Sequence, residues 1–215
     1  MARLVLFDLD GTILGGISSE NAFFFHLLLN GYIGIKQFLI ASYCCLKWLP
    51  RFKWHVFIKN KSYLYGLSTE ETTALAKKFV QEKLLKNIRP ELRARIEEHR
   101  KAGDHLILLT GSLECLANEF ARDLNIPEVC ATRCVHKLGQ FTDLLPLQHP
   151  YAREKLKIAK ELCEKYNTEL KHCIAYGNST NDRFLLKAVG KAIAVTPHRY
   201  LRKLAKKEGW EIIDT

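Results

Sequence analysis

The amino-acid sequence predicts an α/β fold, a Rossmann-like three-layer sandwich in which a parallel sheet lies between helices. Short apolar runs, each suited to a strand buried on both faces, alternate along the chain with amphipathic helical stretches. This alternation is typical of a parallel sheet with helices on both sides. Hydrophobic residues make up 47% of the chain and charged residues 26%, a globular composition that excludes collagen-like, coiled-coil and disordered classes.

The first strand is predicted at residues 4–7, an apolar run that is too short for a helix. A long apolar and aromatic region follows at residues 21–67. Next, residues 70–86 have the periodicity of an amphipathic helix, and a capping-box pattern begins at Ser68. The chain therefore places a largely helical region directly after its first strand.

The middle of the chain continues the alternation. A helix is predicted at residues 90–101, because Pro90 favours a helix start and Gly103 a helix stop. A second buried strand at residues 105–109 leads to Ser112, which we expect to be the N-cap of the next helix.

The remaining elements follow the same rules. The expected helices are residues 114–124 and 151–166. The expected strands are residues 129–132, 173–176, 192–195 and 210–213, with a small hairpin at 135–141 that turns at Gly139.

The charge balance favours anionic partners. The chain has 33 basic and 23 acidic residues, a net charge of +10, and the stretches 47–61 and 187–207 contain basic residues but no acidic ones. Phosphorylated small molecules and membrane surfaces fit this charge; no nucleic acid partner is expected, because no motif for one is present. Seven cysteines without a C-x-x-C pair and the absence of a signal-peptide pattern predict a cytoplasmic location.

Polar side chains gather where three predicted strands end. Asp8 and Asp10 follow the first strand, Thr110 follows the second, and Asn178 and Asp182 follow a later one. In a doubly wound sheet, sites form beyond the carboxyl ends of the strands. Two carboxylates at positions i and i+2 resist joint ionisation, and a hard cation held by oxygen ligands, with magnesium the usual candidate, removes that cost.

These residues carry a family resemblance. Residues 7–12, Phe-Asp-Leu-Asp-Gly-Thr, resemble the first motif of the haloacid dehalogenase superfamily of phosphotransferases. Residues 109–112 resemble its second motif, residues 177–182 its fourth, and Lys155 best matches its third-motif lysine. The sequence near the C-terminus, residues 194–197 followed by Gly-Trp, is similar to subclass IB, which contains phosphoserine phosphatase and phosphatidylglycerophosphatase-type enzymes.

The resemblance implies a division into two parts. Residues 1–14 and 87–215 would form the catalytic core, and residues 15–86 would form a mainly helical cap inserted after the first strand.

The resemblance also implies catalytic roles. Asp8 would attack phosphorus and form an aspartyl-phosphate, and Asp10 would act as general acid and then general base. Lys155 would neutralise the charge that Asp8 shares with the phosphoryl group. Lys157 lies two positions further along and competes with Lys155 for this role.

Two sets of binding residues complete the implied site. The phosphate-binding set is Thr110, Gly111 and Thr12. The Mg²⁺ ligands would be Asp8, Asp10 through its backbone carbonyl, Asn178 and Asp182. Asn178 departs from the family pattern, since many relatives have Asp there. An amide oxygen still coordinates a metal, but the site loses one negative charge.

Three functions are consistent with these residues. The first is a magnesium-dependent phosphomonoester hydrolase that acts on a small phosphorylated metabolite such as phosphoserine. The second is the same chemistry on a lipid headgroup phosphate, phosphatidylglycerophosphate-like, with the cap docked at the inner face of a membrane. The large apolar residues of the cap fit a small helical bundle packed over the active site. Together with its tryptophans and lysines they also fit a cap that docks on a membrane surface, and no stretch is long and apolar enough to span a bilayer. The third is a non-catalytic phosphate-binding module.

Overall fold

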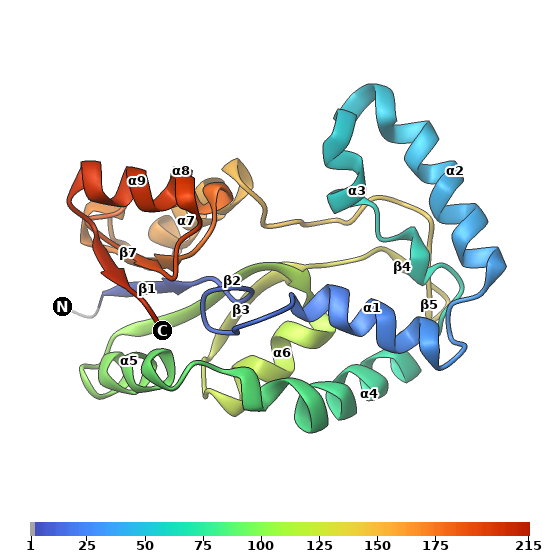
Figure 1. Ribbon diagram of the computed structural model, residues 1–215, viewed down its shortest axis with the longest axis horizontal. Helices are drawn as coiled ribbons and strands as arrows, with labels where there is room; N and C mark the ends of the chain where they lie inside the picture. The colour runs from blue at the N-terminus through green and yellow to red at the C-terminus, as the bar shows by residue number, and fades with distance from the viewer. Residues whose placement is uncertain (1–2) are drawn as a thin grey trace.

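The computed structural model describes residues 3–215 (Figure 1). Its central sheet contains six parallel strands in the order β3-β2-β1-β6-β7-β8. The strands are β1 (Leu4–Phe7), β2 (His105–Leu113), β3 (Glu128–Thr132), β6 (Ile174–Gly177), β7 (Lys191–Val195) and β8 (Glu211–Ile213). A hairpin of β4 (His136–Lys137) and β5 (Gln140–Phe141) lies outside this sheet. The predicted α/β sandwich is confirmed.

Helices cover both faces of the sheet. The α-helices of the described residues are α1 (Ser19–Leu29), α2 (Ile35–Phe52), α3 (Val56–Lys59), α4 (Thr69–Phe79), α5 (Pro90–Lys101), α6 (Glu114–Asp123), α7 (Arg153–Lys165), α8 (Arg183–Leu186) and α9 (Arg199–Glu208), of which α2 and α3 do not cover the sheet (Figure 1). Apolar side chains of α1, α4, α5 and α6 form the core on one face, and those of α7, α8 and α9 form the core on the other. Each core lies between the sheet and one layer of helices, and the two helix layers are the outer layers of the sandwich.

Strand β1 shows why its sequence is apolar at every position. Val5 and Phe7 point into one core, and Leu4 and Leu6 point into the other. All four side chains are buried. Because successive side chains of a strand face opposite sides, a strand covered on both faces needs an unbroken apolar run.

Two local predictions differ from the structure. The predicted helix at 70–86 is α-helical only to Phe79, and a π-helical turn (Val80–Leu84) and a 3₁₀ turn (Leu85–Asn87) follow. The predicted N-cap role of Ser112 is wrong, because β2 continues to Leu113 and that residue precedes α6. The Ser112 hydroxyl instead donates to Asp10.

The helical insertion leaves and re-enters the sandwich at one place. Gly15 donates its backbone N–H to Asn87 O at 3.0 Å, and Arg89 donates to Ile13 O at 2.9 Å. The two ends of the segment between them are therefore pinned together. The division into a core and a cap with these bounds stays a prediction.

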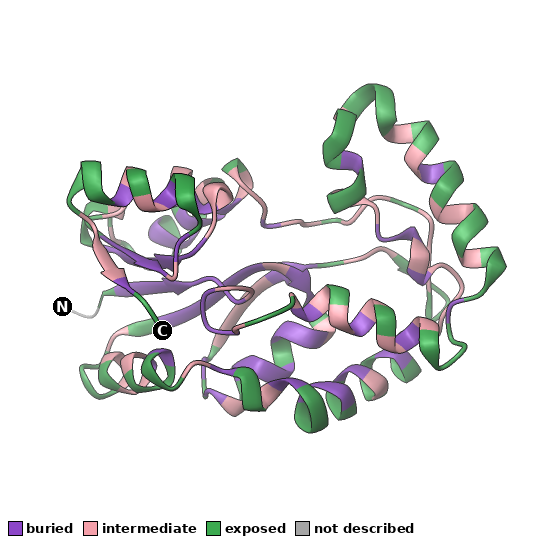
Figure 2. Cartoon of the chain, in the orientation of Figure 1, coloured by how far each residue is buried: buried purple, intermediate pink, exposed green. Residues whose placement is uncertain are grey.

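The insertion does not pack as a separate bundle. Helices α1 and α4 contribute Phe23, Leu27 and Phe79 to the core on the α5–α6 face of the sheet. The segment of residues 35–59, which comprises α2, α3 and the turn between them and is called the arm below, stands clear of the sheet and is largely exposed (Figures 1 and 2). No helix within residues 3–215 is both long enough and apolar enough to cross a membrane.

An ion pair beside β1 gives a prediction about acid stability. Asp104 accepts hydrogen bonds from Arg3 Nη2 and His99 Nδ1, each at 2.7 Å. Burial would raise the pKa of Asp104, but its bonds to Arg3 and His99 outweigh burial and lower the pKa to about 2 from an ordinary 3.8. Its stabilising effect is therefore complete above its unfolded-state pKa and is lost as pH falls through the folded-state value.

We expect Asp104→Asn to reduce the free energy of unfolding by about 1–2 kcal/mol near neutral pH, a figure lowered because Arg3 is partly exposed. Urea unfolding of both proteins at about pH 7 and about pH 3 measures this, and the difference should shrink by roughly half at the lower pH. An equal difference at both pH values would show that the carboxylate charge is not responsible.

Candidate active site

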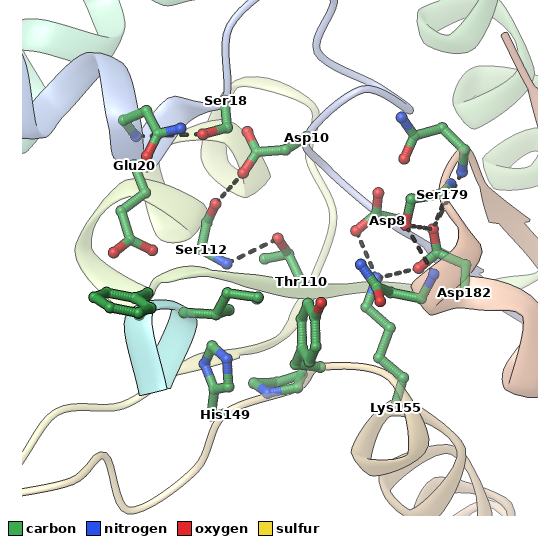
Figure 3. A pocket seen from close by; sticks show the side chains of 18 of the residues that line it. Asp8, Asp10, Ser18, Glu20, Thr110, Ser112, His149, Lys155, Ser179 and Asp182 are labelled. Atoms are coloured by element: carbon green, nitrogen blue, oxygen red, sulfur yellow. Dashed lines mark hydrogen bonds and ion pairs between the residues drawn. The ribbon is translucent and has the colours of Figure 1, made fainter. Parts of the chain in front are cut away.

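A pocket of about 410 Å³ opens at the carboxyl ends of β1, β2 and β6. The strand order reverses here, because β1 is followed outward by β2 and β3 on one side and by β6, β7 and β8 on the other. Ligands of doubly wound sheets bind at such a switch point. Figure 3 shows the side chains that line the pocket.

Asp8 lies at the bottom of this pocket, directly after β1. Lys155 Nζ donates to Asp8 Oδ1 at 2.6 Å, and Thr12 Oγ1 donates to Asp8 Oδ2 at 2.8 Å. Thr12 is fully buried, and its single hydroxyl proton is directed at Asp8. In this structure the Thr12 hydroxyl holds Asp8, and the phosphate contact of Thr12 stays a prediction.

Lys155 is the lysine that reaches the pocket. It sits in the first turn of α7, is buried, and also donates to Asp182 Oδ1 at 2.7 Å (Figure 3). Lys157 is exposed and pairs with Glu154 and Glu161 on its own helix. The alternative left open by the sequence is therefore resolved geometrically in favour of Lys155.

Asp182 is held more tightly than Asp8. Its Oδ2 accepts from the backbone N–H of Asn178 at 3.2 Å, the backbone N–H of Ser179 at 3.0 Å and the Ser179 hydroxyl at 2.9 Å. A Cβ on Gly177 would lie 2.7 Å from the Asp182 Cβ, so glycine is needed there for this close approach. These bonds let Asp182 position Lys155 and the loop, while Oδ1 accepts only the Lys155 bond; its role as a metal ligand stays a prediction.

The two carboxylates share one ammonium group. Burial would lower the pKa of Lys155, but Asp182 and Asp8 outweigh burial and raise it, so the lysine stays charged. Burial would raise the pKa of Asp182, but Lys155 and the Ser179 bonds lower it. Asp8 has fewer donors, and burial raises its pKa to about 7 in spite of Lys155. A further cation at Asp8 would favour its ionised form.

Asp10 is fixed by two serines that the sequence did not assign to the site: Ser19, and Ser112, which was expected to cap a helix. Ser19 donates its backbone N–H to Asp10 Oδ1 at 2.7 Å and its hydroxyl to Oδ2 at 3.2 Å. The Ser112 hydroxyl also donates to Asp10 Oδ2, and the Ser19 and Ser112 hydroxyls lie 2.8 Å apart. Burial raises the pKa of Asp10, although the bonds from Ser112 and Ser19 oppose it. Since Ser19 begins α1, this contact joins the insertion to the sandwich.

The irregular end of β2, residues 110–112, is supported from behind. Thr110 Oγ1 accepts from Ser112 N at 3.1 Å, which leaves the Thr110 hydroxyl proton free to donate. The Thr132 hydroxyl donates to Gly111 O at 2.6 Å. Thr132 Oγ1 also lies 2.8 Å from His149 Nδ1, and because its only proton is used on Gly111, His149 Nδ1–H is the donor. Burial lowers the pKa of His149 to about 3, so the ring is neutral.

Thr132 and His149 are thus positioning residues that no motif indicated. We expect Thr132→Val to leave the Gly111 carbonyl and the His149 N–H without hydrogen-bond partners. This lowers the free energy of unfolding by about 1–3 kcal/mol and loosens the end of β2 at Gly111. The expected result is a fall in kcat/KM of about tenfold, mainly through KM, for a phosphomonoester such as para-nitrophenyl phosphate. Thr132→Ser keeps the hydroxyl and is the matched control. Equal kinetics for the two variants would show that the Thr132 hydroxyl does not position the end of β2.

An acid–base pair lines the wall of the pocket nearer the arm. Lys61 Nζ donates to Glu20 Oε1 at 2.5 Å and Oε2 at 2.7 Å, and the Tyr63 hydroxyl donates to Oε1 at 2.8 Å. Phe57 and Ile58 of α3 line the same pocket. This wall is where the part of a substrate beyond its phosphate would lie.

The pocket has the oxygen donors that a hard cation prefers. Asp8 and Asp182 share the single ammonium of Lys155, and the carboxyl group of Asp10 lines the same pocket, so three carboxyl groups gather in one place. The Asn178 side chain lies so close to Gly11 that a Cβ there would meet Asn178 Nδ2 at 1.9 Å. Within residues 3–215 no three His, Cys, Asp or Glu side chains form a metal-binding group, so an amide and a main-chain carbonyl would supply the remaining oxygens.

The role of Asn178 can be tested by titrating magnesium. We expect Asn178→Asp to lower the Mg²⁺ concentration that gives half-maximal rate, because an anionic oxygen binds a divalent cation more strongly than an amide oxygen does. Asn178→Ala removes the oxygen and should raise that concentration. If neither change moves the midpoint, the loop of residues 177–182 does not hold the metal.

A family model and several known proteins match this chain. The model described as haloacid dehalogenase-like hydrolase matches residues 5–187. A probable phosphatase of Mycobacterium tuberculosis is 29% identical over 212 residues, which span 96% of this chain and 73% of that protein. A phosphoserine phosphatase of the same organism is 31% identical over 156 residues, or 73% of this chain and 51% of that protein.

Solved structures match over the whole chain. A protein of unknown function from Bordetella pertussis has a TM-score of 0.80 at 24% identity and covers 100% of this chain and 99% of its own. A phospho-aspartyl intermediate analogue of phosphoserine phosphatase has a TM-score of 0.66 at 19% identity, covering 99% of this chain and 93% of that one. At these identities, the structural matches show the fold.

Proposed function

Because the chain belongs to the haloacid dehalogenase-like hydrolase family, we propose that it hydrolyses a small phosphomonoester through an aspartyl-phosphate on Asp8. It is a phosphatase, as are named relatives. The observation that carries the proposal is the buried Asp8–Lys155 ion pair, which lies in one pocket with Asp10 and with Thr110 and Gly111 of β2.

In the first step, Asp8 forms a bond from a carboxylate oxygen to phosphorus, and the bond from phosphorus to the ester oxygen breaks. Asp10 gives its proton to that leaving oxygen, so an alcohol departs. Its raised pKa favours the protonated form needed here, and Ser19 and Ser112 hold its carboxyl group in place. Thr12 holds the attacking carboxylate.

In the second step, Asp10 takes a proton from a water molecule as that water attacks phosphorus. The bond between phosphorus and Asp8 breaks, inorganic phosphate leaves, and both aspartates return to their starting states. Lys155, the Thr110 hydroxyl and the Gly111 amide would stabilise the phosphoryl oxygens in both steps.

Phosphatases of this family generally use a divalent metal, typically Mg²⁺. In this chain Asp8, the Asp10 backbone carbonyl, Asn178 and Asp182 would hold it. When bound, it would supply positive charge to the phosphoryl oxygens and lower the pKa of Asp8.

For the substrate, we propose a small phosphorylated metabolite such as phosphoserine. The name of the phosphoserine phosphatase relative and the small, polar pocket support this. The test is a screen of soluble phosphomonoesters with and without Mg²⁺, with Asp8→Asn as the blank. Phosphate release from none of them, including para-nitrophenyl phosphate, would favour the alternative of a non-catalytic phosphate-binding module.

A lipid headgroup phosphate is the second candidate substrate, and the arm favours it. Phe57 is 60% exposed and Ile58 37% exposed, yet both line the pocket, so an apolar surface adjoins the mouth of the site. Adding phosphatidylglycerophosphate in mixed micelles to the same screen separates the two candidates, because a soluble-metabolite enzyme would prefer phosphoserine.

A further inference from the structure

The outer face of α2 carries an apolar stripe that faces solvent. Ile35, Leu39, Tyr43 and Leu46 are 80%, 66%, 61% and 71% exposed. Their spacing of four, four and three residues places them on one face of the helix. The opposite face is already covered, since Cys44 is buried against the rest of the chain. The stripe is therefore a second apolar face, without a partner among the described residues.

Exposed aromatic side chains also lie in the turn and helix that follow α2. Trp54 is 79% exposed, and its ring stacks on that of Phe57 at 5.9 Å between centroids. The arm stands clear of the sheet, and its ribbon is mostly coloured as exposed (Figure 2). Large apolar side chains exposed together over one segment mark an interaction surface rather than ordinary scatter.

The charge around the stripe is positive throughout. No Asp or Glu occurs between Glu20 and Glu70, while the arm carries Lys36, Lys47, Arg51, Lys53 and Lys59. Lys36 and Lys47 each directly follow a stripe residue, so they lie along the border of the stripe. The Lys47 ammonium lies 5.9 Å from the Tyr43 ring centroid and 5.1 Å from that of Trp48. Aromatic rings and lysines side by side are the composition of a helix at a membrane interface.

We propose that the arm docks on the surface of an anionic lipid bilayer, with α2 lying flat and its stripe entering the headgroup region. The apolar area of the stripe and the cations of the arm would both favour binding there. A second copy of this chain fits less well, because pairing two arms would bring two sets of five cations together without an acidic residue between them. Since α3 lines the pocket, docking would bring the pocket mouth to the membrane surface.

Vesicle flotation tests the inference independently of the phosphatase activity. We expect the chain to float with phosphatidylcholine vesicles that contain about 30 mol% phosphatidylglycerol, and not with phosphatidylcholine alone. Leu39→Ser/Leu46→Ser and, separately, Lys47→Glu/Lys53→Glu should each weaken this binding by at least about tenfold. High salt should weaken the wild type as well.

The matched control is Leu138→Ser/Leu147→Ser, which removes two exposed leucines outside the arm. It should bind vesicles like the wild type, and all variants should hydrolyse soluble para-nitrophenyl phosphate at the wild-type rate. Absence of binding to the anionic vesicles, or equal binding by the arm variants and the wild type, would overturn the inference. So would a dimer in sedimentation experiments that the arm variants abolish, because the stripe would then be a contact between copies.

Discussion

Asp8→Asn should abolish turnover while the chain remains folded. An amide cannot attack phosphorus in place of a carboxylate, so the loss should exceed about 10⁴-fold and reach the background of the assay. The fold should survive because asparagine has nearly the same volume, and Lys155 keeps its bond to Asp182. Burial raises the pKa of Asp8, because an ionised carboxylate in the pocket loses its contact with water. Asparagine removes this desolvation cost, which offsets the loss of the ion pair with Lys155.

Two measurements on the same preparations of wild type and Asp8→Asn test this: the initial rate of para-nitrophenyl phosphate hydrolysis and the thermal unfolding temperature. Asp10→Asn is the companion variant, with an expected loss of at least ~10² for a substrate with a poor leaving group. Wild-type activity in Asp8→Asn would reject the nucleophile assignment. An unfolded Asp8→Asn protein would show instead that Asp8 is required for the fold, and the assignment would then rest on Asp8→Glu, which keeps the charge but moves the oxygen.

Lys155→Met should have the largest effect on stability of any single change in the pocket. It leaves Asp8 and Asp182 buried without their shared cation, which costs about 3–5 kcal/mol. Without Lys155, the pKa of Asp8 rises further, so the nucleophile is protonated near neutral pH and activity is lost as well. Lys157→Met, on the exposed face of the same helix, should change both quantities little.

A double variant separates the two effects of that lysine. Lys155→Met/Asp182→Asn removes one of the stranded charges, so it should recover part of the unfolding free energy but none of the activity. The checks are urea unfolding and phosphate release. Full activity in Lys155→Met, or unchanged stability, would contradict the arrangement described here.

The buried strands were predictable because their positions are covered on both faces. Every residue of β1 enters one core or the other, so the sequence shows an apolar run and then Asp8 where the sheet ends. The clustering of Asp8 and Asp182 was predictable for a related reason, whereas Lys155, which lies on α7, was indicated only by the family resemblance. Parallel strands bring their carboxyl ends to one edge, and the motifs mark those ends.

Other parts of the site depend on contacts that short motifs do not encode. Ser19 reaches Asp10 only because the insertion folds back over the end of β1. The distance from Thr132 and His149 to Gly111 is likewise set by tertiary packing. Ser112 looked like a helix N-cap because it precedes α6, but the longer β2 directs its hydroxyl to Asp10.

The shape of the insertion also could not be predicted from the sequence. Apolar residues throughout residues 21–67 indicated a bundle packed over the site or a membrane-docking cap, and composition alone could not separate them. In the structure the insertion divides, with α1 and α4 inside the core of one sheet face and the arm outside it. The difference lies in which face of α2 is covered, and that depends on the path of the whole segment.

Trapping the covalent intermediate is the most direct test of the central claim. Wild-type protein in steady-state turnover would be quenched with sodium borohydride, which reduces an acyl phosphate to an alcohol, and its peptides would be mapped by mass spectrometry. The mechanism predicts homoserine in place of Asp8, formed only when substrate is present and absent in Asp8→Asn. Continued phosphate release with no modified Asp8, or with the modification on another carboxylate, would contradict an aspartyl-phosphate at this residue.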